Sequence, residues 1–123
     1  MEERILVVDD EEGVVRVVEE ALKKRNHSVI TTLKSTEALE LIKDKKNNIR
    51  MLITDIQMPD IDGLELAKFT REYDQSIKII AISGSATLKG LTEEDKALFN
   101  CFLQKPFDLE ELRSAVIQTS KGI

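Results

Sequence analysis

Short apolar stretches alternate with longer amphipathic stretches along the whole chain. The apolar stretches are rich in Ile, Val and Leu, which is typical of parallel strands that are covered on both faces. We predict strands at Arg4–Val8, Ser28–Thr32, Met51–Thr54, Lys78–Ser83 and Asn100–Leu103. The amphipathic stretches predict helices at Glu12–Arg25, Ser35–Lys45, Gly63–Glu72, Thr92–Leu98 and Leu109–Thr119. This alternation predicts an α/β fold, a doubly wound five-stranded parallel sheet with helices on both faces.

Two features of the predicted helices add detail. Asp62 with Glu65, and Asp108 with Glu111, have the spacing of a capping box, in which two side chains satisfy backbone donors at a helix start. The first helix carries an unusually wide apolar stripe, made of Val14, Val15, Val17, Val18, Ala21 and Leu22. We favour deep packing as the reason for this width; the alternative is that part of the stripe, at Val14 or Val18, is left for a partner helix.

Length and composition favour one compact domain over residues 1–123. The chain has 123 residues, of which 41% are hydrophobic, so one buried core is expected without a disulfide or a structural metal. Cys101 is the only cysteine, and the charged residues Glu2, Glu3 and Arg4 are unlike a signal peptide. No apolar run approaches the roughly 20 residues of a membrane span. We therefore expect a cytoplasmic protein without a membrane anchor.

The charge balance disfavours some classes of partner. The formal net charge is -5, with 18 Lys and Arg against 23 Asp and Glu. Binding to nucleic-acid phosphates needs a positive surface, so direct contact with DNA or RNA is not expected. Neither of the glycine-rich nucleotide-binding motifs, G-x-G-x-x-G or G-x-x-x-x-G-K-[ST], occurs in the sequence.

Chemically active side chains follow four of the predicted strands. Asp9 and Asp10 come after the first, Asp55 after the third, Ser83 at the end of the fourth, and Lys105 after the fifth. Ligands of open parallel sheets bind beyond the carboxyl ends of the strands, so the fold would gather these residues at one rim. Each residue alone is ordinary in a loop; their joint placement predicts a site.

The composition of this rim predicts phosphoryl chemistry with Mg²⁺. Carboxylates that converge would raise one another's pKa unless a cation lay among them, and Mg²⁺ prefers oxygen ligands. A carboxylate can also act as the nucleophile that forms an acyl phosphate, and Asp55 is the candidate because it is a single acid at a central strand end. Lys105 and Ser83 would supply a cation and a hydroxyl donor for the phosphoryl oxygens.

At these residues the sequence resembles the receiver domains of bacterial response regulators. Ile5–Glu11, which reads ILVVDDE, resembles the first strand and acidic pair of the family. Leu52–Gly63, which reads LITDIQMPDIDG, resembles the phosphoacceptor strand and the loop after it. Ser83 and the run Lys105–Phe107 occupy the remaining signature positions. The resemblance covers nearly the whole chain and implies a flavodoxin-like strand order of 2-1-3-4-5.

The resemblance also implies roles for individual residues. Asp55 would be the phosphorylation site, with Lys105 and Ser83 on the phosphate oxygens. Mg²⁺ would be held by Asp10, by Asp55, by the backbone carbonyl of Gln57, and by Asp9 through water. Phe102 would be a switch aromatic that turns from exposed to buried together with Ser83; the plainer interpretation is a packed strand residue. The Lys105–Pro106 peptide is expected to be cis.

We therefore expect a phosphorylation-dependent signalling switch. It would accept a phosphoryl group from a histidine kinase or histidine phosphotransfer protein and act on a downstream protein effector or effector domain. Phosphorylation-dependent dimerisation is compatible with this role, and the chain could be a stand-alone receiver or a piece of a longer regulator. Beyond its own phosphorylation and dephosphorylation we expect no enzyme activity.

Two other functions agree less well with the sequence. A phosphohydrolase with an Asp nucleophile is disfavoured because such enzymes place an acid two residues after the nucleophile, where this chain has Gln57. A pseudo-receiver that works without phosphorylation is disfavoured by the intact acids and Lys105.

Overall fold

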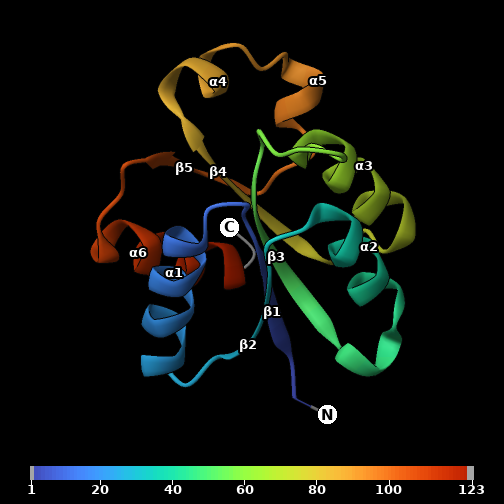
Figure 1. Cartoon of the computed structure of the whole chain (residues 1–123), viewed down its shortest axis with the longest axis vertical. Coiled ribbons are helices and arrows are strands. Elements are labelled where there is room, and N and C mark those ends of the chain that lie inside the picture. The colour runs from blue at the N-terminus through green and yellow to red at the C-terminus, as the bar shows by residue number, and fades with distance from the viewer. Residues whose placement is uncertain (1, 122–123) are drawn as a thin grey trace.

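A five-stranded, all-parallel sheet forms the centre of the computed structural model, which describes residues 2–121 (Figure 1). Its strand order is β2-β1-β3-β4-β5, as the resemblance implied, and every pair of neighbouring strands is parallel. The strands are β1 (Arg4–Val8), β2 (Ser28–Thr32), β3 (Ile49–Asp55), β4 (Lys78–Gly84) and β5 (Cys101–Lys105).

Helices cover both faces of the sheet, so that three layers are formed (Figure 1). The helical segments are α1 (Glu12–Lys24), α2 (Ser35–Lys43), the 3₁₀ turn η1 (Lys45–Asn47), α3 (Gly63–Tyr73), α4 (Ser85–Lys89), α5 (Glu93–Lys96) and α6 (Leu109–Ser120). α1 and α6 pack on one face of the sheet, and α2 and α3 pack on the other. The predicted α/β class is therefore confirmed.

The core has two halves because successive residues of a strand point to opposite faces of the sheet. In β1, Ile5 and Val7 pack with residues of α1 and α6, whereas Leu6 and Val8 pack with residues of α2 and α3. The central strands β1, β3 and β4 are almost entirely buried. Each fully buried Ile, Leu or Val side chain stabilises the fold by about 1.5 to 3 kcal/mol, so the sheet that holds the rim residues is a rigid support.

Capping boxes fix the starts of α3 and α6, as predicted. The Asp62 carboxylate accepts a hydrogen bond from the backbone N–H of Glu65 at 2.8 Å, and the Glu65 carboxylate accepts one from the N–H of Asp62. Asp108 and Glu111 make the same pair of bonds at the start of α6. These acids therefore have a structural role.

The helix predicted at Thr92–Leu98 is present in shortened form as α5, but α4, which precedes it, was not predicted. The structure has two short helices, α4 and α5, between β4 and β5, and α4 covers residues that carried no clear periodicity. Gly90 follows the last residue of α4, and Thr92 begins α5 through its own capping box with Asp95. No residue from 84 to 98 is buried. The segment contributes only partly buried side chains to the core, such as Leu88, Leu91 and Leu98, so its hydrophobic pattern was a poor guide.

Other boundaries moved by a few residues. β3 begins at Ile49 instead of Met51, because Ile49 is buried and pairs with Arg4 of β1. β5 ends at Lys105 instead of Leu103, because Gln104 and Lys105 continue the ladder with β4. α2 ends at Lys43, two residues earlier than predicted, because Asp44 leaves the helix. The side chain of Asp44 instead caps η1 by accepting a hydrogen bond from the N–H of Lys46.

The wide apolar stripe of α1 is only partly used by the core. Val15, Val18 and Leu22 are buried, Val14 and Ala21 are partly buried against the core, and Val17 is 49% exposed. Val18 was wrong as a docking candidate because it has no exposed surface. Deep packing, which we favoured, accounts for most of the stripe. Val17 is the one residue of the stripe that is exposed to solvent. Among residues 2–121, no helix is long and apolar enough to cross a bilayer.

Gly63, the first residue of α3, is expected to tolerate no side chain. A Cβ atom added there would lie 2.2 Å from the backbone oxygen of Asp55 and 2.6 Å from Cα of Ile56. The backbone would have to move to relieve these contacts, so Gly63→Ala should lower the free energy of unfolding by about 2 kcal/mol or more. The matched control is Gly13→Ala in α1, where a Cβ would have no atom within 4 Å.

Urea unfolding of the two variants provides the measurement. Gly13→Ala should be neutral or stabilising by up to about 1 kcal/mol, since Ala is the better helix former. Equal midpoints for Gly63→Ala and the wild type would mean that α3 does not press against the end of β3 as described.

Candidate functional site

The carboxyl ends of four strands meet at one rim of the sheet. Asp9 follows β1, Asp55 ends β3, Ser83 lies one residue before the end of β4, and Lys105 ends β5. β1 and β3 are neighbours at the centre of the sheet, and the chain leaves them towards opposite faces, to α1 and α3. Side chains at this switch point therefore lie in the crevice beyond the strands, where a ligand can reach them.

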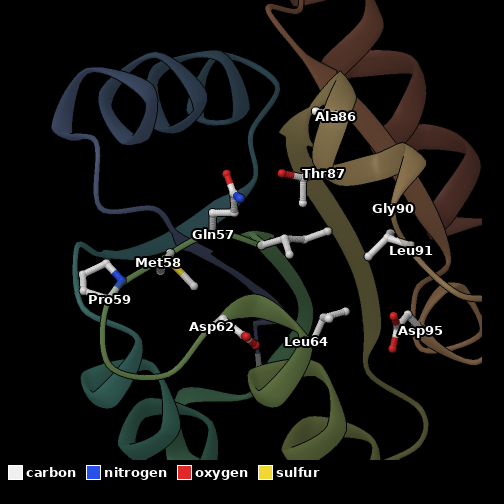
Figure 2. A pocket seen from close by; sticks show the side chains of 11 residues that line it. Gln57, Met58, Pro59, Asp62, Leu64, Ala86, Thr87, Gly90, Leu91 and Asp95 are labelled. Atoms are coloured by element: carbon white, nitrogen blue, oxygen red, sulfur yellow. The ribbon is translucent and has the colours of Figure 1, made fainter.

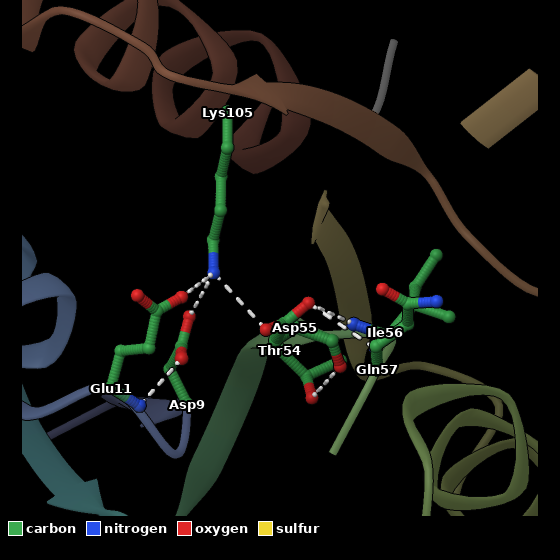
Figure 3. A network of polar contacts seen from close by, with 7 residues as sticks. All are labelled: Asp9, Glu11, Thr54, Asp55, Ile56, Gln57 and Lys105. Carbon is green, nitrogen blue, oxygen red and sulfur yellow. Dashed lines mark hydrogen bonds and ion pairs between the residues drawn. The ribbon is translucent and has the colours of Figure 1, made fainter. Parts of the chain in front are cut away.

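The ammonium group of Lys105 is the centre of the rim (Figure 3). Its Nζ atom lies 3.0 Å from Oδ2 of Asp9, 2.9 Å from Oε1 of Glu11 and 3.0 Å from Oδ2 of Asp55. Asp9 is 1% exposed and Asp55 is 6% exposed, whereas Glu11 is on the surface. One cation thus holds three carboxylates, two of them buried.

This arrangement shifts the pKa of two groups. Burial raises the pKa of the Asp9 carboxyl, and the charge of Asp55 adds to this, while the hydrogen bond from the N–H of Glu11 and the contact with Lys105 oppose it. Burial alone would lower the pKa of Lys105, but hydrogen bonds to Glu11, Asp9 and Asp55 outweigh that effect and raise it. Lys105 is therefore charged throughout the physiological range, and the rim retains an excess of negative charge.

The backbone holds the Asp55 carboxylate in a fixed orientation. Its Oδ1 atom accepts hydrogen bonds from the N–H groups of Ile56, at 2.7 Å, and Gln57, at 3.3 Å. Its Oδ2 atom faces Lys105 (Figure 3). Because one oxygen is held by the loop and the other faces a cation, the carboxylate is already oriented before any ligand binds.

Glu11 was missed by the reasoning from sequence. It is the residue before α1, and its carboxylate contacts Lys105 instead of capping the helix. The available signal was the run of four acids from Asp9 to Glu12, which we interpreted through Asp9 and Asp10 alone. A pairing between residues 94 positions apart has no local signature.

The predicted metal-binding residues are only partly gathered. Carboxylate oxygens of Asp9, Glu11 and Asp55 lie within 4.8 Å of one another. Asp10 is exposed and is outside that group, and Gln57 is also exposed. Oδ2 of Asp9 is buried, and its charged partner among residues 2–121 is the ammonium group of Lys105, 3.0 Å away. Three carboxylate oxygens that share one ammonium group form a set of hard oxygen atoms, which fits a divalent cation such as Mg²⁺.

The two predicted switch residues lie outside the charged network. Ser83 is 1% exposed, and its side chain has no hydrogen-bond partner in the described part of the chain. Phe102 is 37% exposed and packs against Phe99, with 5.4 Å between the ring centroids. Phe102 is thus in a partly exposed position, and Ser83 has a hydroxyl that is free to donate. The Lys105–Pro106 peptide is cis, as expected.

A groove of about 630 Å³ opens beside the phosphoacceptor candidate (Figure 2). One side is the loop after β3, with Ile56, Gln57 and Met58; the other is the α4–α5 segment, with Thr87 and Leu91. The groove therefore opens to solvent beside the loop that follows Asp55, and Asp55 itself does not line it.

Comparison with known proteins adds an independent line of evidence. The model of the family described as response regulator receiver domain matches residues 5–117. The two-component response regulator ARR10 of Arabidopsis thaliana is 31% identical over 121 residues, which is 96% of this chain but only 22% of that protein. Sporulation initiation phosphotransferase F of Bacillus subtilis is 28% identical over 94% of this chain and 92% of its own length.

Solved structures agree with the sequence comparison. A putative two-component response regulator with a GGDEF domain is 32% identical, with a TM-score of 0.87, over 98% of this chain and 49% of that one. The chemotaxis protein CheY4 of Vibrio cholerae is 25% identical, with a TM-score of 0.80, over 97% and 99% of the two chains. The chain belongs to the receiver domain family of two-component response regulators, whose general function is phosphorylation-dependent signalling.

Proposed function

We propose that this receiver domain takes a phosphoryl group onto Asp55 from a histidine kinase or a histidine phosphotransfer protein. The observation that carries the proposal is the position of the Asp55 carboxylate, which is buried, oriented by two backbone N–H groups and paired with Lys105. No other acid among residues 2–121 combines these three features.

Asp10, Asp55, the carbonyl of Gln57 and, through water, Asp9 are the groups that would hold Mg²⁺. The ion would neutralise charge on the phosphoryl oxygens and so lower the repulsion between the carboxylates and the incoming group. This assignment rests on the resemblance of the motifs and on the carboxylate oxygens of Asp9, Glu11 and Asp55, which lie within 4.8 Å of one another.

The residues of the rim fit each part of the transfer. A carboxylate oxygen of Asp55 bonds to phosphorus while the bond from phosphorus to the donor nitrogen breaks; that nitrogen keeps the electron pair and takes up a proton. Lys105 and the Ser83 hydroxyl would each hold a phosphoryl oxygen. In dephosphorylation, which is a separate reaction, the oxygen of a water molecule bonds to phosphorus and loses a proton to solvent, while the bond to Asp55 breaks and leaves the carboxylate and inorganic phosphate.

The domain would therefore catalyse only its own phosphorylation and dephosphorylation. A hydrolase of general phosphoesters needs an acid that protonates the leaving group, and Gln57, two residues after Asp55, cannot do so. A domain that works without phosphorylation would not need the charged cluster around Lys105.

Phosphorylation would be read out through Ser83 and Phe102. A phosphoryl oxygen would draw the Ser83 hydroxyl towards Asp55, and Phe102 would then turn inward and give up its contact with Phe99. Phosphate shifts the balance only as far as it binds the two states unequally. The surface made by α4, α5, β5 and α6 adjoins both residues and is our candidate for docking to an effector or to a second copy.

The partners would be proteins. Val17, exposed on α1, is the candidate contact for the phosphoryl donor and replaces Val18 in that role. The chain spans 22% or less of several of its plant relatives, so an attached effector domain would suit it as well as a separate partner. The negative net charge argues against direct contact with nucleic acid, and the unpaired Cys101 suits the cytoplasm.

Treatment with acetyl phosphate and Mg²⁺ should give one phosphoryl adduct, on Asp55. Intact-mass spectrometry followed by peptide mapping measures it. Asp55→Asn should abolish the adduct because the amide is a poor nucleophile, and a chelator should prevent it. The matched control is Asp60→Asn, in the same loop but outside the cluster, which should leave the adduct unchanged; Asn tolerates the positive φ of 68° at this position.

An adduct that persists in Asp55→Asn, or that forms equally well with chelator, would overturn the site assignment. NMR spectra of the same samples test the switch, because signals of Phe102 should change only when the adduct is present. Unchanged Phe102 signals at full phosphorylation would remove Phe102 from the mechanism.

Removal of single rim charges should weaken Mg²⁺ binding to different degrees. Asp10→Asn should weaken it more than Asp9→Asn, because Asp10 has no ion pair among the described residues, whereas Lys105 already offsets the charge of Asp9. NMR titration of both variants with Mg²⁺ gives the order, and the reverse order would make Asp9 the direct ligand.

The pH dependence of stability provides a second readout for Asp9 in the metal-free protein. Since the pKa of Asp9 is raised by folding, its ionisation disfavours the folded state above that pKa. Asp9→Asn should therefore be more stable than the wild type near pH 7. The difference should vanish as the pH falls below the ordinary pKa of Asp, about 3.9; a constant difference would contradict the assignment.

A further inference from the structure

The loop of residues 56–62, between β3 and α3, carries Gln57 and surrounds one side of the site. At its base, the N–H of Gly63 donates to the carbonyl oxygen of Ile56 at 2.7 Å, which closes the loop. Gly63 also packs directly on the backbone of Asp55. The base of the loop is therefore fixed by its own backbone and by the start of α3.

The far end of the loop has no such support from its neighbours in sequence. Pro59 and Asp60 are exposed, and Asp60 has a left-handed backbone with φ of 68°, which costs energy for any residue other than Gly. The backbone groups on either side of Asp60, the carbonyl of Pro59 and the N–H of Ile61, make no bond to each other. Something else must hold this turn in place.

That group is the hydroxyl of Ser35, the first residue of α2. Ser35 is 3% exposed. Its Oγ atom donates to the carbonyl oxygen of Pro59 at 3.3 Å and accepts from the N–H of Ile61 at 3.2 Å. One hydroxyl thus bridges both sides of the strained residue, from an element that is 24 positions away in the sequence.

We infer that Ser35 is a positioning residue for the phosphoacceptor site, which acts by clamping the loop that carries Gln57. This role rests on the proposed function, because it concerns the same Mg²⁺ and phosphoryl site. Ser35 touches none of the reacting atoms. Its effect passes through Pro59 and Ile61 to Gln57, whose N–H also donates to Oδ1 of Asp55.

Mg²⁺ makes the position of this loop matter. The ion demands nearly ideal octahedral geometry with oxygen ligands at 2.0 to 2.1 Å, so a carbonyl ligand on a loosened loop binds it less well. Groups that orient a metal ligand directly change metal affinity by roughly 10-fold to 100-fold when they are removed. Ser35 lies further from the ligand, so we expect a smaller loss, roughly threefold to tenfold.

The test compares Ser35→Ala with a matched loss of a buried hydroxyl elsewhere. Thr70 is fully buried in α3, and its hydroxyl donates to the carbonyl of Leu66 at 2.8 Å, away from the loop. Thr70→Val removes that hydroxyl and keeps the volume. For each protein, NMR gives the dissociation constant for Mg²⁺ in the full chain and the hydrogen-exchange rate of the Ile61 amide.

Ser35→Ala should raise the dissociation constant roughly threefold to tenfold and speed exchange at Ile61, which loses its acceptor. Thr70→Val should change neither, even where it lowers stability. Ser35→Thr, which keeps the hydroxyl, should retain the wild-type values of both.

Two results would overturn the role of Ser35. One is faster exchange at Ile61 with unchanged Mg²⁺ affinity, which would make the bond purely structural. The other is an equal loss of affinity in Thr70→Val, which would reflect stability in general. A wild-type chain that binds no Mg²⁺ would instead contradict the proposed function itself, and the role of Ser35 would fall with it.

Discussion

The pairing of one ammonium group with three carboxylates, around Lys105, is the interaction on which the site depends. Two of these acids, Asp9 and Asp55, are buried, where an unpaired charge is costly. Lys105 makes this arrangement tolerable but does not balance it, since three negative charges meet one positive charge. The excess predisposes the rim to take up a further cation. The same excess would repel a phosphoryl group, so the proposed transfer would need a metal ion at this rim.

The fold holds the charged residues of the cluster close together. The sheet places Asp9 and Asp55 on neighbouring central strands, and β5 brings Lys105 from 50 residues further along the chain than Asp55. Gly63 packs on the backbone of Asp55, and Ser35 holds the tip of the loop that follows it. In contrast, no residue of the α4–α5 segment is buried. The molecule thus combines a buried site with a neighbouring surface whose side chains are at most partly buried.

Much of this architecture could be predicted because it depends on local patterns. Buried strands and amphipathic helices follow from hydrophobic periodicity, and the rim residues follow from their positions at strand ends. What failed depended on distant contacts or on missing ones. Glu11 and Ser35 act through partners 94 and 24 positions away, which no local pattern indicates. Residues 85–90 have no clear periodicity, so α4 was not predicted, and α5 is shorter than the predicted Thr92–Leu98. Val18 and Val17 are adjacent and chemically equal, so only packing could tell which one is exposed.

The stability of Lys105→Met, measured by urea unfolding with and without Mg²⁺, tests the central role of the charge cluster most directly. Without metal, the variant should be less stable than the wild type by roughly 2 kcal/mol near pH 7, less than for a fully buried pair because Glu11 is exposed. Saturating Mg²⁺ should stabilise the variant more than the wild type, since the ion no longer competes with an ammonium group for the same oxygens. Equal stability of the two proteins without metal, or an equal gain from Mg²⁺, would contradict the account.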